Sequence, residues 1–228
     1  MATSTAQRTG IWIIAIVLIV GTLAGFVAMI LAPQNQAADS ARLEKVYAKY
    51  QKDNEEYQAK VTAQADELSQ KYYGNFSEYQ NEAGEFDKDS VKELSTRDLE
   101  AGSGETVTKD SKYAIYYLGW NPSGKVFDSS LDDGKLKAPL VRESEGNWIF
   151  PGGQQGGVIE GWEKGILGMK IGGVRELTLT SDLAYGETGS GEDIPANTPL
   201  KFIVMIIEKP ETIKQPEIPK ELMQSYGG

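Results

Sequence analysis

Residues 112–130 read KYAIYYLGWNPSGKVFDSS, and this stretch decides the fold class. Its first part, up to Leu118, is rich in aromatic and β-branched residues, which favour a strand. The sequence Asn-Pro-Ser-Gly at 121–124 is typical of a turn, and the strand pattern resumes at 125–127. The stretch therefore predicts a β-hairpin.

Four further segments extend this interpretation over the C-terminal half of the chain. Residues 93–99 indicate a short edge strand, and residues 173–183 alternate apolar and polar side chains as a half-buried strand does. Residues 200–208 form a final, largely apolar strand, whereas 158–167 is a short helical candidate containing two glycines. Together they predict an α+β domain, an antiparallel sheet of about five strands with one short helix on its concave face.

Composition narrows the chemistry. The chain has 228 residues and a net charge of −10, which argues against an electrostatic nucleic-acid partner. It contains no cysteine and no histidine, so thiol nucleophiles, Ser-His-Asp triads and nearly all zinc sites are excluded. No pair of catalytic carboxylates stands out, and neither a metal nor a cofactor is expected.

The N-terminus predicts a membrane anchor. Residues 11–32 form a run of 22 residues without a charge. As a helix they would span about 33 Å, which matches the hydrocarbon core of a bilayer. A cleaved signal peptide is the alternative, but its apolar region would be shorter. We expect a single-pass cell-membrane protein with a cytoplasmic tail at 1–10 and an extracytoplasmic C-terminal domain, periplasmic or at the cell surface.

Residues 33–90 predict a helical stalk and linker. Between 37 and 73 the chain is rich in Ala, Gln, Glu and Lys without Pro or Gly, and Gly74 is expected to end the helix. A parallel coiled coil that forms a homodimer and a single spacer helix both remain open. Heptad-like positions of the stalk are occupied by Leu43, Tyr47, Tyr50, Tyr57, Val61 and Leu68.

Residues 210–228 contain three prolines and predict an extended tail.

Four motifs then appear in a specific order: FDSS at 127–130, VIEGW at 158–162, GMKIGG at 168–173 and YGETG at 185–189. In this order and spacing they resemble the FKBP family of peptidyl-prolyl cis/trans isomerases. The resemblance covers about residues 91–209 and implies an FKBP-like antiparallel sheet of five to six strands wrapped around one short helix. The expected fold class places a transmembrane helix and a helical stalk before this domain.

The resemblance implies an enzyme that rotates X-Pro bonds in exported or surface proteins as a folding helper. Proline-containing polypeptides and macrolide inhibitors are the implied ligands, although the polar loop at 186–193 departs from many family members. The implied catalytic residues are Tyr117, Phe127, Asp128, Ile159, Trp162, Tyr185 and Phe202. The implied substrate-binding residues are Trp148, Phe150, Val158 and Ile194.

The resemblance also assigns roles. Aromatic side chains around Trp162 would hold the prolyl ring, while the Ile159 N–H and the Tyr185 hydroxyl would bind backbone carbonyls. Asp128 would shape the field near the rotating carbonyl, or would only make a structural hydrogen bond. A catalytically weak FKBP-like binding or chaperone module on a membrane-anchored stalk is the alternative function. The polar segment 135–147 is interpreted as a surface excursion.

Overall fold

A computed structural model describes residues 36–224 of the chain. The chain forms two compact units: Lys60–Ile213 form one, and the remaining described residues belong to the other. The long helix α2, Gln36–Ser77, contributes residues to both units. The α2 sequence is rich in helix formers over most of its length, which explains the continuous helix.

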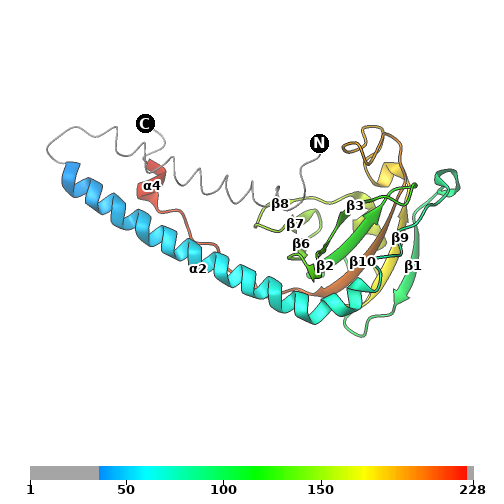
Figure 1. Cartoon of the computed structure of the whole chain (residues 1–228), viewed down its shortest axis with the longest axis horizontal. Helices are drawn as coiled ribbons and strands as arrows, with labels where there is room; N and C mark the ends of the chain where they lie inside the picture. Colours follow the sequence, from blue (N-terminus) through cyan, green and yellow to red (C-terminus); the bar gives the residue numbers. More distant parts are fainter. Residues whose placement is uncertain (1–35, 225–228) are drawn as a thin grey trace. The chain divides into compact units, whose positions relative to one another are not determined.

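The unit Lys60–Ile213 is built around one antiparallel sheet (Figure 1). The strand order is β1-β9-β10-β2-β6-β7-β8, and β3 pairs with the C-terminal end of β2. A separate pair of short strands, β4 and β5, follows β3. The main strands are β1 (Ser95–Glu100), β2 (Tyr113–Trp120), β3 (Val126–Ser129), β6 (Leu140–Ser144), β7 (Asn147–Ile149), β8 (Gln155–Gly156), β9 (Val174–Leu179) and β10 (Leu200–Glu208). The minor elements are β4 (Leu131–Asp132), β5 (Lys135–Leu136) and the 3-10 helices η1 (Lys88–Ser90) and η2 (Ser181–Leu183).

The two central strands, β2 and β10, are buried on both faces. Side chains alternate across a strand, so Tyr113 and Ile115 of β2 join one buried cluster while Ala114 and Tyr116 join another. This double burial explains why both strands have almost unbroken apolar sequences rather than an alternating pattern.

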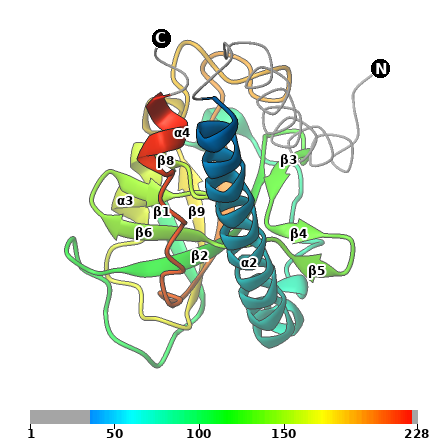
Figure 2. The same cartoon turned by 90° about the vertical axis from the view of Figure 1, so that its left-hand side faces the viewer.

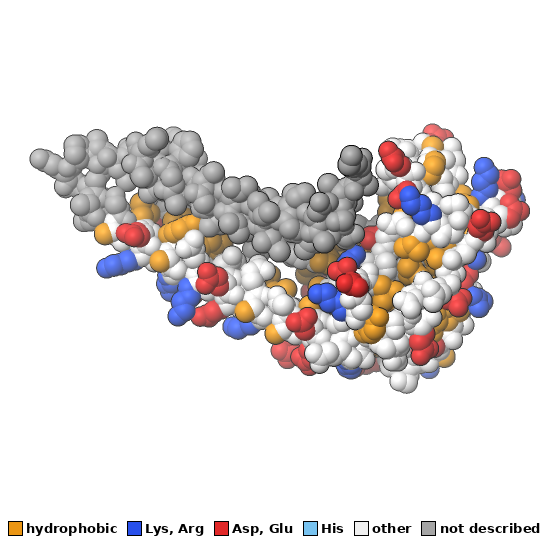
Figure 3. All heavy atoms as spheres, in the orientation of Figure 1, with side chains coloured by type: hydrophobic (Ala, Val, Ile, Leu, Met, Phe, Trp, Pro, Cys, Tyr) orange, Lys and Arg blue, Asp and Glu red, His pale blue; other side chains and the backbone are white. Residues whose placement is uncertain are grey.

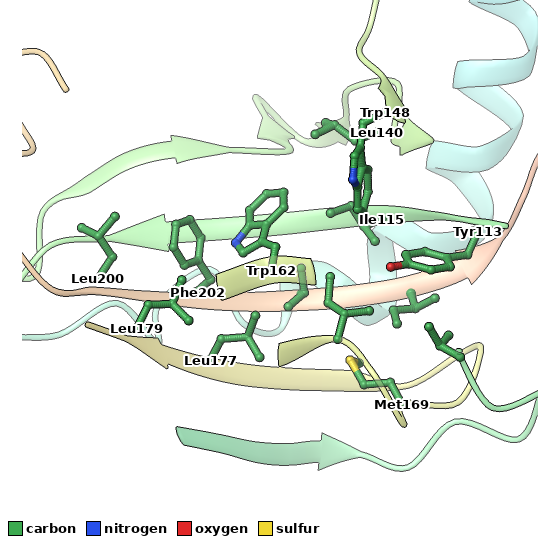
Figure 4. Packing of buried hydrophobic residues seen from close by; sticks show 14 of the residues in the cluster. Tyr113, Ile115, Leu140, Trp148, Trp162, Met169, Leu177, Leu179, Leu200 and Phe202 are labelled. Carbon is green, nitrogen blue, oxygen red and sulfur yellow. The ribbon is translucent and has the colours of Figure 1, made fainter. Parts of the chain in front are cut away.

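One face of the sheet is covered by the short helix α3, Glu160–Gly165. Figure 4 shows its Trp162 lying over β2 beside Phe202 of β10. A side chain on Gly161 would place its Cβ 2.5 Å from Leu179, so this glycine permits the close approach of helix and sheet. The short helix on the sheet confirms that part of the predicted fold.

The other face is covered by the last turns of α2. Phe76 is fully buried there, and its ring centroid lies 6.3 Å from that of Tyr116 on β2. Gly74 was expected to end the helix, but α2 continues to Ser77 because burial of Phe76 holds the final turn against the sheet. Beyond the helix, Trp120 donates through Nε1 to the carbonyl of Gly84, 3.1 Å away.

The β4–β5 pair lies beside the C-terminal part of α2 (Figure 2). The backbone N–H of Leu136 donates to the hydroxyl of Ser69, 2.8 Å away, and both residues are buried. Residues 135–147 are therefore no surface excursion: they form β5, β6 and the start of β7. The expectation was wrong because the charged side chain of Arg142 in this segment is buried rather than solvated.

The second unit contains the first part of α2 and the short helix α4, Lys220–Gln224. Arg42 and Glu221 form an ion pair across 3.6 Å, and Lys49 pairs with Asp53 at 3.0 Å along α2. Charged side chains of both signs lie along α2 in Figure 3. Part of the predicted extended tail is thus helical.

The predicted fold class needs one correction. Within residues 36–224, every helix is too short or too polar to cross a membrane, α2 included. The segment 11–32, for which the sequence predicts a membrane-spanning helix, lies outside the described residues. The described part of the chain begins with a polar helix, and its main antiparallel sheet has eight strands, several of them very short.

Candidate functional site

Four aromatic rings meet between α3 and the sheet, and we refer to them as the aromatic cluster. Trp162 of α3 lies at its centre, with ring centroids 4.9 Å from Tyr117 and 5.2 Å from Phe202. Phe127 contacts Phe202 edge to face at 5.6 Å. Such edge-to-face contacts are favourable, and they fix the rings relative to one another. The predicted residues Tyr117, Phe127, Trp162 and Phe202 are therefore brought together.

Local backbone features aim these rings. The register between β2 and β3 shifts between Gly119 and Trp120, which leaves Phe127 unpaired and turns its side chain toward the cluster. Gly119 leaves the space that the rings occupy, because a Cβ there would lie 2.6 Å from Phe202 and 2.8 Å from Phe127. Gly119 was not singled out from the sequence, since a glycine in a strand does not reveal what packs over it.

Asp128 lies at the edge of the cluster. Its Oδ2 accepts a hydrogen bond of 2.5 Å from the Tyr117 hydroxyl, and its Oδ1 accepts from the Ser129 N–H at 2.8 Å. Burial raises the pKa of Tyr117 well above its usual range, and the nearby Asp128 carboxylate raises this pKa further. The Tyr117 hydroxyl is therefore protonated at neutral pH and donates to Asp128. The structural hydrogen bond considered for Asp128 is present.

Tyr185 stands at the rim and is 37% exposed. Burial and the charge of Asp128 raise its pKa, so its hydroxyl is also protonated and able to donate. The loop that follows is held to the β2–β3 turn: Lys125 forms an ion pair with the Asp193 carboxylate, and Asn121 donates to the Asp193 carbonyl at 2.8 Å. These contacts fix the polar loop beside Tyr185.

Ile159 precedes α3 in an extended conformation, and its carbonyl accepts from the N–H of Trp162 at 3.0 Å. Its own N–H donates to no acceptor within residues 36–224, so this group is available to a ligand. The indole Nε1 of Trp162 is buried and likewise has no partner in the described part of the chain. Buried polar groups without partners are rare and need an explanation, and a binding site offers one.

The remaining predicted residues pack around the cluster. Val158 and Phe150 are half-buried against the same core, and Ile194 is buried in it. Trp148 is fully buried, and its ring centroid lies 6.4 Å from that of Trp162. Trp148 therefore backs the cluster and contributes no exposed surface of its own. Among the described residues there is no group of acidic side chains that could hold a metal ion.

Sequence reasoning missed two charged residues next to the cluster. Glu163 on α3 and Arg142 on β6 form an ion pair at 3.2 Å with little exposure of either side chain. The sequence shows that Glu163 directly follows Trp162. It does not indicate that Arg142 pairs with Glu163, because the two residues are far apart along the chain.

The sequence is similar to a known family and to several known proteins. A family model described as FKBP-type peptidyl-prolyl cis-trans isomerase matches residues 103–207. An FK506-binding protein of Neisseria meningitidis serogroup A is 38% identical over 115 residues, which are 50% of this chain and 94% of that protein. An FK506-binding protein 1A of Neurospora crassa is 45% identical over 101 residues, 44% of this chain and 73% of that protein.

Among solved structures, a peptidyl-prolyl cis-trans isomerase from Pseudomonas syringae is 28% identical. The match covers 52% of this chain and 76% of that one, with a TM-score of 0.39. The sequence matches, which cover nearly the whole of the Neisseria relative, establish the family. The chain belongs to the FKBP-type peptidyl-prolyl cis-trans isomerases, a class of enzymes.

Proposed function

We propose that this chain catalyses cis/trans rotation about X-Pro bonds in the aromatic cluster between α3 and the sheet. The observation that carries the proposal is the meeting of Trp162, Tyr117, Phe127 and Phe202 next to two unpaired donors, the Ile159 N–H and the Trp162 indole N–H. An apolar wall with a few convergent polar groups is the usual form of a small binding site.

The reaction needs no nucleophile. Amide resonance sets a barrier of about 18–20 kcal/mol to rotation, and uncatalysed X-Pro exchange takes about 10–100 s. The twisted transition state has lost this resonance, so its amide is less polar than the planar ground state. An apolar, water-poor site therefore stabilises the transition state relative to the hydrated ground state.

The residues divide this work. Trp162, Phe127 and Phe202 would hold the prolyl ring. The Ile159 N–H and the protonated Tyr185 hydroxyl would bind the flanking carbonyls and fix the peptide while its X-Pro bond turns. Asp128 orients Tyr117 through their hydrogen bond and adds negative charge at the rim.

The direct test is an X-Pro exchange assay on the full chain, by NMR line shape or protease coupling. We expect acceleration by the wild type, and a loss of about tenfold or more in kcat/KM for Phe127→Ala, which removes one face of the cluster. Val141→Ala is the control, because Val141 packs against the opposite core. A folded wild-type chain without acceleration would exclude turnover and leave a binding or chaperone module.

Three finer proposals concern the setting of this site. An extracytoplasmic location and exported or surface clients rest on the uncharged run of residues 11–32 and are tested by protease accessibility in intact cells. Self-association rests on the heptad-like stripe of the stalk, and sedimentation analysis decides between a monomer and a homodimer. Macrolide binding is a general property of the family and is tested by inhibition of the exchange assay.

A further inference from the structure

A polar contact network centres on Glu163, the residue that follows Trp162 in α3. The carboxylate of Glu163 accepts from the Trp148 indole N–H at 2.6 Å and from the Gly146 N–H at 3.1 Å through the same oxygen, Oε1. Its other oxygen accepts from Arg142 Nε at 3.2 Å. The carboxylate therefore links α3 to the β6–β7 hairpin through three donors.

Arg142 is itself held in place. Its side chain is 2% exposed, and its remaining nitrogens donate to the carbonyls of Ser111 at 2.8 Å and Lys109 at 3.0 Å. A guanidinium buried to this degree is tolerated only when it is paired and hydrogen-bonded. Because these partners come from the segment before β2, the network ties three parts of the chain together.

The network reaches the aromatic cluster through Trp148. The indole of Trp148 lies edge to face on Tyr113, with ring centroids 5.7 Å apart, and its other neighbour is Trp162 at 6.4 Å. Figure 4 shows both indoles beside β2. A hydrogen bond to Glu163 fixes the rotation of the Trp148 ring, and that ring limits where Trp162 can lie.

The helix that carries Trp162 needs such restraint. A single helix of six residues has little stability of its own, so its position depends on tertiary contacts. Arg175 holds the C-terminal end by donating to the carbonyls of Gly165 at 2.9 Å and Leu167 at 3.1 Å. Glu163 provides the contact on the side that faces the β6–β7 hairpin.

We propose that Glu163 is a positioning residue for the isomerase site. It acts through the Trp148 indole N–H to fix Trp162 in the aromatic cluster, and Arg142 holds the carboxylate in place. The inference rests on the proposed function for its effect on turnover, but the placement of Trp162 can be measured separately.

The experiment compares Trp148→Phe, Glu163→Ala and Glu163→Gln in the full chain. Trp148→Phe keeps an aromatic ring but removes the N–H donor. Glu163→Gln keeps an acceptor for Trp148, whereas Glu163→Ala removes it. Glu176→Gln is the matched control, since Glu176 is similarly shielded, at 13% exposure, and pairs with Arg97 and Lys201 away from Trp162.

We expect kcat/KM to fall about tenfold in Glu163→Ala and about three- to tenfold in Trp148→Phe. Glu163→Gln should recover a clear part of the loss, and Glu176→Gln should lower the melting temperature while kcat/KM stays within about twofold. If the loss in kcat/KM is proportional to the loss in melting temperature across all four variants, Glu163 only stabilises the fold. That result would overturn the proposal.

An NMR spectrum of the chain labelled with 15N-tryptophan gives a readout independent of turnover. The Trp162 indole signal, assigned with Trp162→Phe, should shift in Trp148→Phe and in Glu163→Ala but stay in place in Glu176→Gln. If the chemical shift of the Trp162 indole stays unchanged in both Trp148→Phe and Glu163→Ala, the positioning role is refuted. If that signal shifts but the wild type does not accelerate exchange, the proposed function fails and the positioning of Trp162 stands.

Discussion

Replacing Phe76 by alanine tests whether the last turns of α2 belong to the isomerase domain. The Phe76 side chain is fully buried on the sheet face opposite the aromatic cluster, against Tyr116 and Tyr79. Truncation of a buried phenylalanine costs about 3–5 kcal/mol, from lost transfer free energy and from the cavity left behind. For a chain of this size we expect the melting temperature to fall by about 6–20 °C.

The measurement is thermal unfolding followed by circular dichroism, beside a chemical denaturation series. Gln70→Ala is the control, because Gln70 is exposed on the same helix and its loss should cost no more than about 0.5 kcal/mol. At a temperature where Phe76→Ala is folded, kcat/KM should stay within about twofold, since the site lies on the other face. A stability loss below about 1 kcal/mol would mean that α2 is dispensable for the domain.

Three other changes probe the site and its surroundings. Gly119→Ala places a methyl group against two rings of the aromatic cluster, so we expect kcat/KM to fall about tenfold in a folded protein; an unchanged rate in the exchange assay would contradict this packing. Tyr185→Phe removes a rim donor and should lower kcat/KM about two- to tenfold, and no change would remove the hydroxyl from the binding scheme. A hydrogen bond from Arg175 lowers the pKa of Asp98, so the pair stabilises the fold above the ordinary aspartate pKa and loses this effect as pH falls through the lowered value. Denaturation at several pH values should show a shallower acid dependence in Asp98→Asn, and an identical dependence would rule out the linkage.

The sheet and its helix could be predicted from the sequence because their signals are local. β2, β10 and α3 each have a distinctive run of residues, and the ordered motifs brought Phe127 and Trp162 into one candidate site. The aromatic cluster has the composition of an ordinary core, so only the order of the motifs singled it out.

The missed features depend on contacts between distant residues. Arg142 lies in a charged segment, and charged side chains are normally exposed, so its burial against Glu163 was not predicted. Gly74 predicted a helix end, but Phe76 two residues later packs on the sheet and extends α2. The short strands β6, β7 and β8 also lack a strong periodic pattern, and neighbouring strands hold them in the sheet.

The burial of β2 and β10 on both faces has a consequence for how the domain opens. Each of the two cores covers one side of the same pair of strands, so both faces of these strands reach water only when both cores open. Exchange of the β2 and β10 amides with deuterated solvent should therefore require global unfolding, whereas the edge strands β1 and β8 can open locally. The slowest-exchanging amides of the chain should trace out this shared pair of strands.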